Sequence, residues 1–138
     1  PIWAVPLLRE AGAIVRNQTV LLRGINDDGR VLGGLLKQLT SIGVIPYYVF
    51  QCRPVTGVKS QFQVPFARAY QIVEEARFMQ NGQGKCFRYV LSHPTGKIEI
   101  LGPGADGQML FKYHQAKKDS DGGRIFSVPL TEDQAWLD

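Results

Sequence analysis

The feature that most constrains this fold is an apolar run followed at once by a polar turn, within residues 17–28. Residues 19–22 (Thr-Val-Leu-Leu) are β-branched or aliphatic and lack helical spacing, which predicts a buried strand. Gly24 ends this strand, and the side-chain oxygens at positions 26–28 can cap a following helix. Ligands of parallel α/β proteins bind at the carboxyl ends of strands, so this turn marks one edge of a candidate site. These residues are equally compatible with the alternative that the turn only caps its helix.

The first part of the chain alternates predicted strands and helices, which is typical of a parallel sheet. A short helix over residues 7–11 comes first, and the segments that follow are a strand over 13–22, a helix over 31–42, a strand over 44–52, a loop over 53–63 and a helix that begins at Pro65. Gly33 and Gly34 each weaken the helix over 31–42 by about 1 kcal/mol relative to alanine, so packing must hold it. The strand over 44–52 is apolar on both faces, which predicts cover on each side.

The remainder of the chain has short strands separated by glycine- and proline-rich turns, which indicates antiparallel pairing. The expected segments are a strand over 86–91, a turn over 92–97, and strands over 98–101, 109–114 and 124–128. The sequence therefore predicts an α/β fold with a short antiparallel β-rich extension. We place the division between the two regions at residues 1–82 and 83–138.

Composition excludes several classes of protein. The 138 residues carry a net charge of +4 with scattered basic residues, too few in any one place for a nucleic-acid interface. Cys52 and Cys86 are the only cysteines, so we expect neither a disulfide framework nor a structural zinc site. No apolar run is long enough to span a membrane. Free thiols and the absence of a signal peptide lead us to expect a cytoplasmic protein with no membrane or nucleic-acid partner.

Three segments together resemble the lysine 2,3-aminomutase family. They are Asn-Gln-Thr-Val-Leu-Leu-Arg-Gly-Ile-Asn-Asp at 17–27, Pro-Tyr-Tyr-Val-Phe-Gln-Cys at 46–52, and the turn that leads to Lys97. The likeness covers about residues 7–101 and continues more loosely to Lys117. Members of this family are radical S-adenosylmethionine enzymes that also bind pyridoxal phosphate.

The resemblance implies that the chain supplies the last strand–helix units of a partial (β/α) barrel. The family's Cys-x3-Cys-x2-Cys motif is absent, and two cysteines cannot hold a 4Fe-4S cluster. We therefore expect S-adenosylmethionine and the cluster only with an upstream half, and we expect this chain to be inactive alone. The chain does not begin with Met, so either it is a piece of a longer protein or it is a degenerate relative.

The resemblance also assigns candidate cofactor residues. Lys97 matches the family lysine that bonds covalently to pyridoxal phosphate, a role that needs a mobile yet positioned amine. Gln18 matches a residue near the cofactor phosphate, to which an amide nitrogen can donate. His93 lies beside the turn and could contact the pyridoxal ring, whereas His114 lies where the likeness is weaker. Without the resemblance, Lys97 would be interpreted as a solvated turn residue, Gln18 as a polar strand residue and His93 as structural.

Two further positions bear on the substrate. Lysine-specific members carry aspartates that pair with the distal ammonium of lysine, and these positions align with Arg53 and Ser92. Arginine reverses the charge at its position, which disfavours lysine and favours a carboxylate. The alternative is that Arg53 points outward.

Val49 and Phe50 lie on the strand that the resemblance places beside the adenosyl group. Their apolar side chains suit either a wall of an adenosyl-binding site or the core.

These observations lead to two functional hypotheses. The first is the C-terminal portion of an amino-acid 2,3-aminomutase-like isomerase that is not lysine-specific. Its catalytic and cofactor-binding lysine is Lys97, and no metal ligands are expected within this chain. The second is a non-catalytic binding or assembly module derived from the same family. In either case an open parallel strand edge favours association, so we expect a homo-oligomer.

Overall fold

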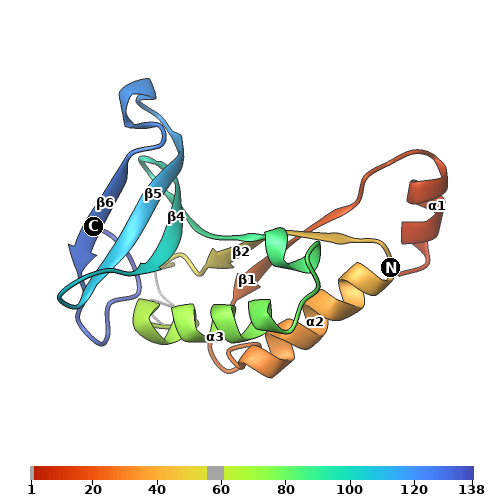
Figure 1. Ribbon diagram of the computed structural model, residues 1–138, viewed down its shortest axis with the longest axis horizontal. Helices are drawn as coiled ribbons and strands as arrows, with labels where there is room; N and C mark the ends of the chain where they lie inside the picture. The colour runs from red at the N-terminus through yellow and green to blue at the C-terminus, as the bar shows by residue number, and fades with distance from the viewer. Residues whose placement is uncertain (1, 56–60) are drawn as a thin grey trace.

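The computed structural model of the protein describes residues 2–55 and 61–138, in which six strands form one mixed sheet accompanied by three α-helices (Figure 1). Along the chain these elements are α1 (Ala4–Glu10), β1 (Arg16–Leu21), α2 (Gly29–Ser41), β2 (Ile45–Gln51), α3 (Phe66–Phe78), β3 (Arg88–His93), β4 (Gly96–Pro103), β5 (Gln108–Ala116) and β6 (Ile125–Pro129). Two short 3-10 turns, η1 (Gly84–Cys86) and η2 (Asp119–Asp121), precede β3 and β6.

The strands lie side by side in sequence order, from β1 to β6. β1, β2 and β3 are parallel, whereas β4, β5 and β6 continue the sheet with antiparallel pairing. This confirms the α/β fold and the antiparallel extension predicted from the sequence. The sheet is continuous between the regions 1–82 and 83–138, because β2 pairs with β3.

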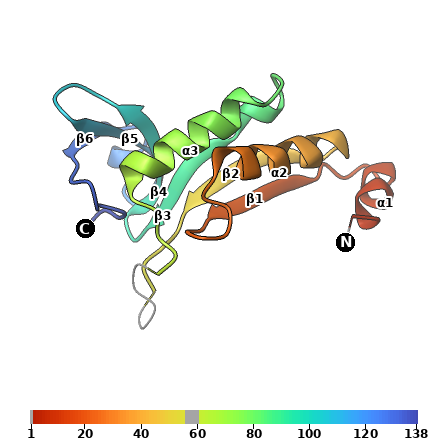
Figure 2. The same ribbon diagram turned by 90° about the horizontal axis from the view of Figure 1, so that it is seen from below.

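Helices α2 and α3 lie on the same face of the sheet (Figure 2). They bury a core with residues that point from the strands toward them. Its central members are Leu21, Leu32, Leu36, Val49, Phe66, Ile72, Val73, Tyr89, Leu91, Ile98 and Phe111. The strand over 44–52 was predicted to be covered on each side, but in the part of the chain that the structure describes helices cover only one face of β2. We call the opposite side of β1–β5 the uncovered face.

Close packing holds α2 in spite of its two glycines. A Cβ atom on Gly33 would lie 2.3 Å from Met79 Sδ and 3.2 Å from the Ala76 backbone, so glycine lets α3 approach closely. The predicted apolar stripe is narrower than expected, since Val31 and Leu35 are exposed.

The hairpin between β3 and β4 is tighter than the predicted turn over residues 92–97. β3 continues to His93 and β4 begins at Gly96, which leaves only Pro94 and Thr95 between the strands. Lys97 is therefore a strand residue, paired with Ser92, and not a turn residue. Gly96 has φ of 142° and lies so close to β5 that a Cβ atom would be 2.1 Å from the Gln115 carbonyl oxygen.

The segment after β2 and the N-terminal helix complete the fold. Of the loop predicted over 53–63, residues 56–60 lie outside the described part. Helix α1 confirms the predicted short helix, and it stands apart from the sheet and the other helices (Figures 1 and 2). None of the helices in residues 2–55 and 61–138 has the length and apolar character needed to cross a membrane.

We predict opposite effects of alanine at two glycines. Gly96→Ala should lower the free energy of unfolding by about 2–4 kcal/mol, because it adds both a steric clash and a strained backbone. Gly34→Ala should raise it by about 0.5–1 kcal/mol, because Gly34 is helical and a Cβ atom there meets nothing within 4 Å. Denaturant unfolding of both variants measures this, and equal effects would contradict the hairpin geometry.

Candidate functional site

A cleft of about 470 Å³ lies on the uncovered face, toward the carboxyl ends of the parallel strands. It is lined by residues from β1, from β2 and the segment after it, and from β3. These residues are Gln18, Val20, Phe50, Gln51, Cys52, Arg53, Val55 and Ser92. The cleft is therefore built from segments that are distant in the sequence.

The cleft brings together three residues that the sequence nominated separately, Gln18, Arg53 and Ser92. Lys97 lies beside them, because it is the direct partner of Ser92 across β3 and β4 and opposed residues point to the same face. The Lys97 Nζ is 5.7 Å from the centroid of the Phe50 ring, which lines the cleft. Four of the five nominated residues thus share one region of the uncovered face.

His93 is not brought to this region. It follows Ser92 in β3, so its side chain points to the opposite face of the sheet. Its Nδ1 lies 2.8 Å from Thr95 Oγ1, and its Nε2 lies 3.1 Å from the carbonyl oxygen of Leu137. The ring also packs near Trp136, so the histidine links the β3–β4 hairpin to the C-terminal segment.

The structure also separates Val49 from Phe50. Val49 is fully buried in the core beneath the helices. Phe50 points to the uncovered face and is only half-buried at the cleft. The core interpretation therefore holds for Val49, and Phe50 supplies an apolar wall.

The polar turn after β1 has a structural role. Asn26 Oδ1 accepts a hydrogen bond of 2.7 Å from the Leu22 N–H, and its Nδ2 donates to the Val20 carbonyl at 2.9 Å. Asp28 is the N-cap of α2 and accepts from the Arg30 N–H at 2.8 Å. These bonds fix the end of β1 and the start of α2, as the capping interpretation predicted.

A buried amide anchors the segments around the cleft. Gln51 is 1% exposed, and its Nε2 donates to the carbonyls of Val64 at 2.7 Å and Ala135 at 2.9 Å. Its Oε1 accepts from the Tyr89 hydroxyl. One side chain at the end of β2 therefore holds β3, the segment before α3 and the C-terminal segment.

Replacement of Gln51 tests this anchor. Gln51→Leu should lower the free energy of unfolding by about 3 kcal/mol or more, because it leaves two carbonyls and a phenol without partners in the interior. Gln38→Leu, on the exposed side of α2, should change it by less than about 0.5 kcal/mol. Urea unfolding of the two variants makes the comparison, and similar midpoints would rule out the anchor.

The uncovered face is rich in positive charge. Arg88, Lys97 and Lys112 lie on it together with one carboxylate, Glu99, which forms a 2.9 Å ion pair with Arg88. Burial and these three cations lower the pKa of His114, while Glu99 acts in the opposite direction. Such a face attracts anionic ligands.

Sequence reasoning missed Tyr48 as a residue of this face. Tyr48 is 4% exposed, and its hydroxyl lies 2.9 Å from His114 Nε2 on β5. Because β3 and β4 lie between these strands, the contact requires the uncovered face to be concave. The sequence did contain a signal for this placement. Side chains of a strand alternate between its faces, so Tyr48 and Phe50, two residues apart in β2, share a face.

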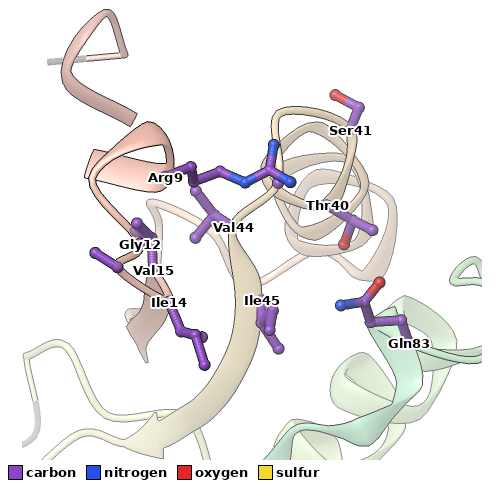
Figure 3. Close-up of a pocket in the computed structure, with 11 residues that line it drawn as sticks. Arg9, Gly12, Ile14, Val15, Thr40, Ser41, Val44, Ile45 and Gln83 are labelled. Carbon is purple, nitrogen blue, oxygen red and sulfur yellow. The ribbon is translucent and has the colours of Figure 1, made fainter. Parts of the chain in front are cut away.

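A second cavity, of about 540 Å³, lies between α1 and the amino ends of β1 and β2 (Figure 3). Arg9 enters it from α1, and its guanidinium lies against Gly43 at the end of α2. This cavity is at the opposite end of the strands from the nominated residues. Among residues 2–55 and 61–138, no group of three His, Cys, Asp or Glu side chains is placed to hold a metal ion.

Comparison with known proteins identifies relatives. No protein-family model matches the chain. A putative L-lysine 2,3-aminomutase of Aquifex aeolicus (strain VF5) is 42% identical over 135 residues, which cover 98% of this chain and 36% of the relative. The chain is a relative of the lysine 2,3-aminomutases.

Other aminomutases give shorter matches. An L-lysine 2,3-aminomutase of Clostridium subterminale is 39% identical over 79 residues, 57% of this chain and 19% of the relative. A glutamate 2,3-aminomutase of Clostridioides difficile is 37% identical over 89 residues, 64% of this chain and 21% of the relative. The chain spans about a third or less of the length of these aminomutases.

Proposed function

We propose that this chain is the C-terminal portion of a radical S-adenosylmethionine, pyridoxal phosphate-dependent amino-acid 2,3-aminomutase. The observation that carries the proposal is the gathering of Gln18, Arg53 and Ser92 in one cleft, with Lys97 beside it. These residues come from three separate segments of the chain, and aminomutase relatives match this chain.

The residues of the cleft suit pyridoxal phosphate. The cofactor needs an amine, donors for its phosphate and an apolar surface for its ring. Lys97 offers the amine, Gln18 offers an N–H donor for the phosphate, and Phe50 offers an aromatic wall. The excess of cations on the uncovered face favours the anionic phosphate. When bound, the cofactor supplies a carrier for the substrate amino group.

We assign the substrate an anionic side chain. Arg53 is an exposed residue that lines the cleft, and its guanidinium can bind a carboxylate with two parallel hydrogen bonds. Ser92 adds a hydroxyl at the end of β3, where it brings no negative charge. A cleft of this composition repels the distal ammonium of lysine. One relative of the chain is named glutamate 2,3-aminomutase, which agrees with an acidic substrate.

The rest of the proposed enzyme lies upstream. The sheet geometry supports a partial (β/α) barrel, because parallel strands with helices on one face direct their other face toward a barrel interior. The upstream half would then supply the cysteines that hold the 4Fe-4S cluster, and with it the binding of S-adenosylmethionine. We propose a homo-oligomeric, cytoplasmic enzyme.

We predict that Lys97 forms the covalent bond to pyridoxal phosphate. Borohydride reduction of the native polypeptide with the cofactor, followed by peptide mass spectrometry, should find the adduct on Lys97. Lys97→Ala should abolish this adduct, because no other amine lies beside Ser92 in the register of β3 and β4. Lys85→Ala, at an exposed site in η1, is the matched control and should leave the adduct unchanged.

An adduct spread over several exposed lysines, or no adduct, would refute the assignment. That result would favour the non-catalytic binding module instead. Iron and sulfide analysis of the same native polypeptide separates the two hypotheses independently, because the module would carry no cluster.

Arg53 provides a separate prediction about the substrate. Arg53→Asp should lower kcat/KM for glutamate by about 10- to 100-fold, because a charge-assisted hydrogen bond is lost and a repulsion replaces it. Arg53→Lys keeps the positive charge and should lose much less. Turnover of glutamate and lysine by the native enzyme and both variants is the measurement. An unchanged preference in Arg53→Asp would remove Arg53 from the substrate pocket.

A further inference from the structure

The amine of Lys97 is seated on an aromatic ring. Its Nζ lies 4.3 Å from the centroid of the Tyr48 ring, well within the range of a cation–π interaction. Lys97 is half-buried, and none of the ion pairs found among residues 2–55 and 61–138 includes it. The Phe50 ring is farther away, with its centroid 5.7 Å from Nζ, so Tyr48 makes the closer aromatic contact with this amine.

The Tyr48 ring is itself held rigidly. Its hydroxyl bonds to His114 Nε2 at 2.9 Å, and the two rings meet edge to face at 5.8 Å. Burial, reinforced by neighbouring Tyr47, raises the pKa of Tyr48 to about 12, so the phenol keeps its proton. Burial and nearby cations lower the pKa of His114, so its neutral Nε2 can accept that proton in a hydrogen bond.

Val90 lies on β3, next to the strand that carries the aromatic rings of Tyr48 and Phe50. Val90 also belongs to the uncovered face, because it lies between Tyr89 and Leu91, which point into the helix-covered core. It is nevertheless fully buried, and it is the register partner of Phe50. The rings of Tyr48 and Phe50 lie 5.5 Å apart and form a continuous aromatic surface beside the cleft.

We propose that the Tyr48 ring, held by His114, is the seat of the Lys97 ammonium whenever this amine is not bonded to the cofactor. The inference rests on the proposed function, in which Lys97 must release the cofactor to the substrate and later take it back. Tyr48 is then a positioning residue that acts through Lys97. It keeps the released amine beside the cleft and away from solvent.

The proposal has a thermodynamic consequence. In this proposal the ring contacts the Lys97 amine only in its free ammonium form, so it stabilises the state in which Lys97 has released the cofactor. Tyr48→Leu should therefore shift the equilibrium toward the lysine-bonded state by roughly 3- to 10-fold, the range expected for a partly desolvated cation–π contact. Tyr48→Phe keeps the aromatic face and should stay within about twofold of the wild type.

The contact can be tested without the cofactor. Reductive ¹³C-methylation labels the lysines of the native polypeptide, and Lys97→Ala identifies the Lys97 signal. A methyl group above the Tyr48 ring should be displaced upfield in the NMR spectrum by the ring current. The displacement should persist in Tyr48→Phe and fall in Tyr48→Leu to the smaller contribution of the more distant Phe50 ring. Tyr70→Leu, on the helix-covered side, controls for general loss of packing and should leave it unchanged.

A second experiment tests the role with pyridoxal phosphate and methylamine as the competing amine. The fraction of Lys97 that carries the cofactor is measured by borohydride trapping at increasing methylamine concentration. The midpoint concentration should rise about 3- to 10-fold in Tyr48→Leu. An equal midpoint in wild type and Tyr48→Leu would overturn the proposal that the Tyr48 ring holds the free Lys97 ammonium, while the proposed function would stand.

The two failures are distinguishable. Absence of any cofactor on wild-type Lys97 overturns the proposed function, and with it the role of the seat. An undisplaced Lys97 methyl signal in the wild type, or a displacement of the same size in Tyr48→Leu as in the wild type, overturns the contact itself, whatever the cofactor does.

Discussion

The arrangement of the site depends on the buried amide of Gln51. In the dry interior its two donated bonds and one accepted bond connect β2 with β3, with the segment before α3 and with the C-terminal segment. Gln63 extends the connection. Its side-chain Nε2 donates to the Cys52 carbonyl, and its backbone carbonyl accepts from the Arg23 Nε after β1. The carboxyl ends of β1 and β2 are thereby fixed to each other, and the Tyr89 bond ties them to β3. The cleft is lined by residues of these three strands and of the segment after β2.

The two faces of the sheet serve different purposes. The helix-covered face carries the main hydrophobic core, whose burial stabilises the fold. The uncovered face carries a cleft, a concave aromatic surface and an excess of cations. Because stability comes from one side, the other can hold amines and guanidinium groups that would be costly in a core.

The sequence predicted the strand–helix alternation, the antiparallel extension and the cap at Asp28, because each depends on local patterns of apolar and polar residues. It did not predict that the face of β2 opposite the helices is uncovered, since Tyr48 and Phe50 are apolar whether a helix or a ligand covers them. The predicted turn over residues 92–97 is too long because glycine is typical of turns, whereas Gly96 is the first residue of β4 and allows close pairing with β5. The contact of Tyr48 with His114 spans 66 positions and follows only from the curvature of the sheet.

The most direct test of this account is an experimental structure of the native protein with pyridoxal phosphate bound. The account predicts continuous density from Lys97 Nζ to the cofactor, with the cofactor on the uncovered face and its phosphate within hydrogen-bond distance of Gln18. Cofactor density on the helix-covered face, in the cavity beside Arg9, or bonded to another lysine would contradict it.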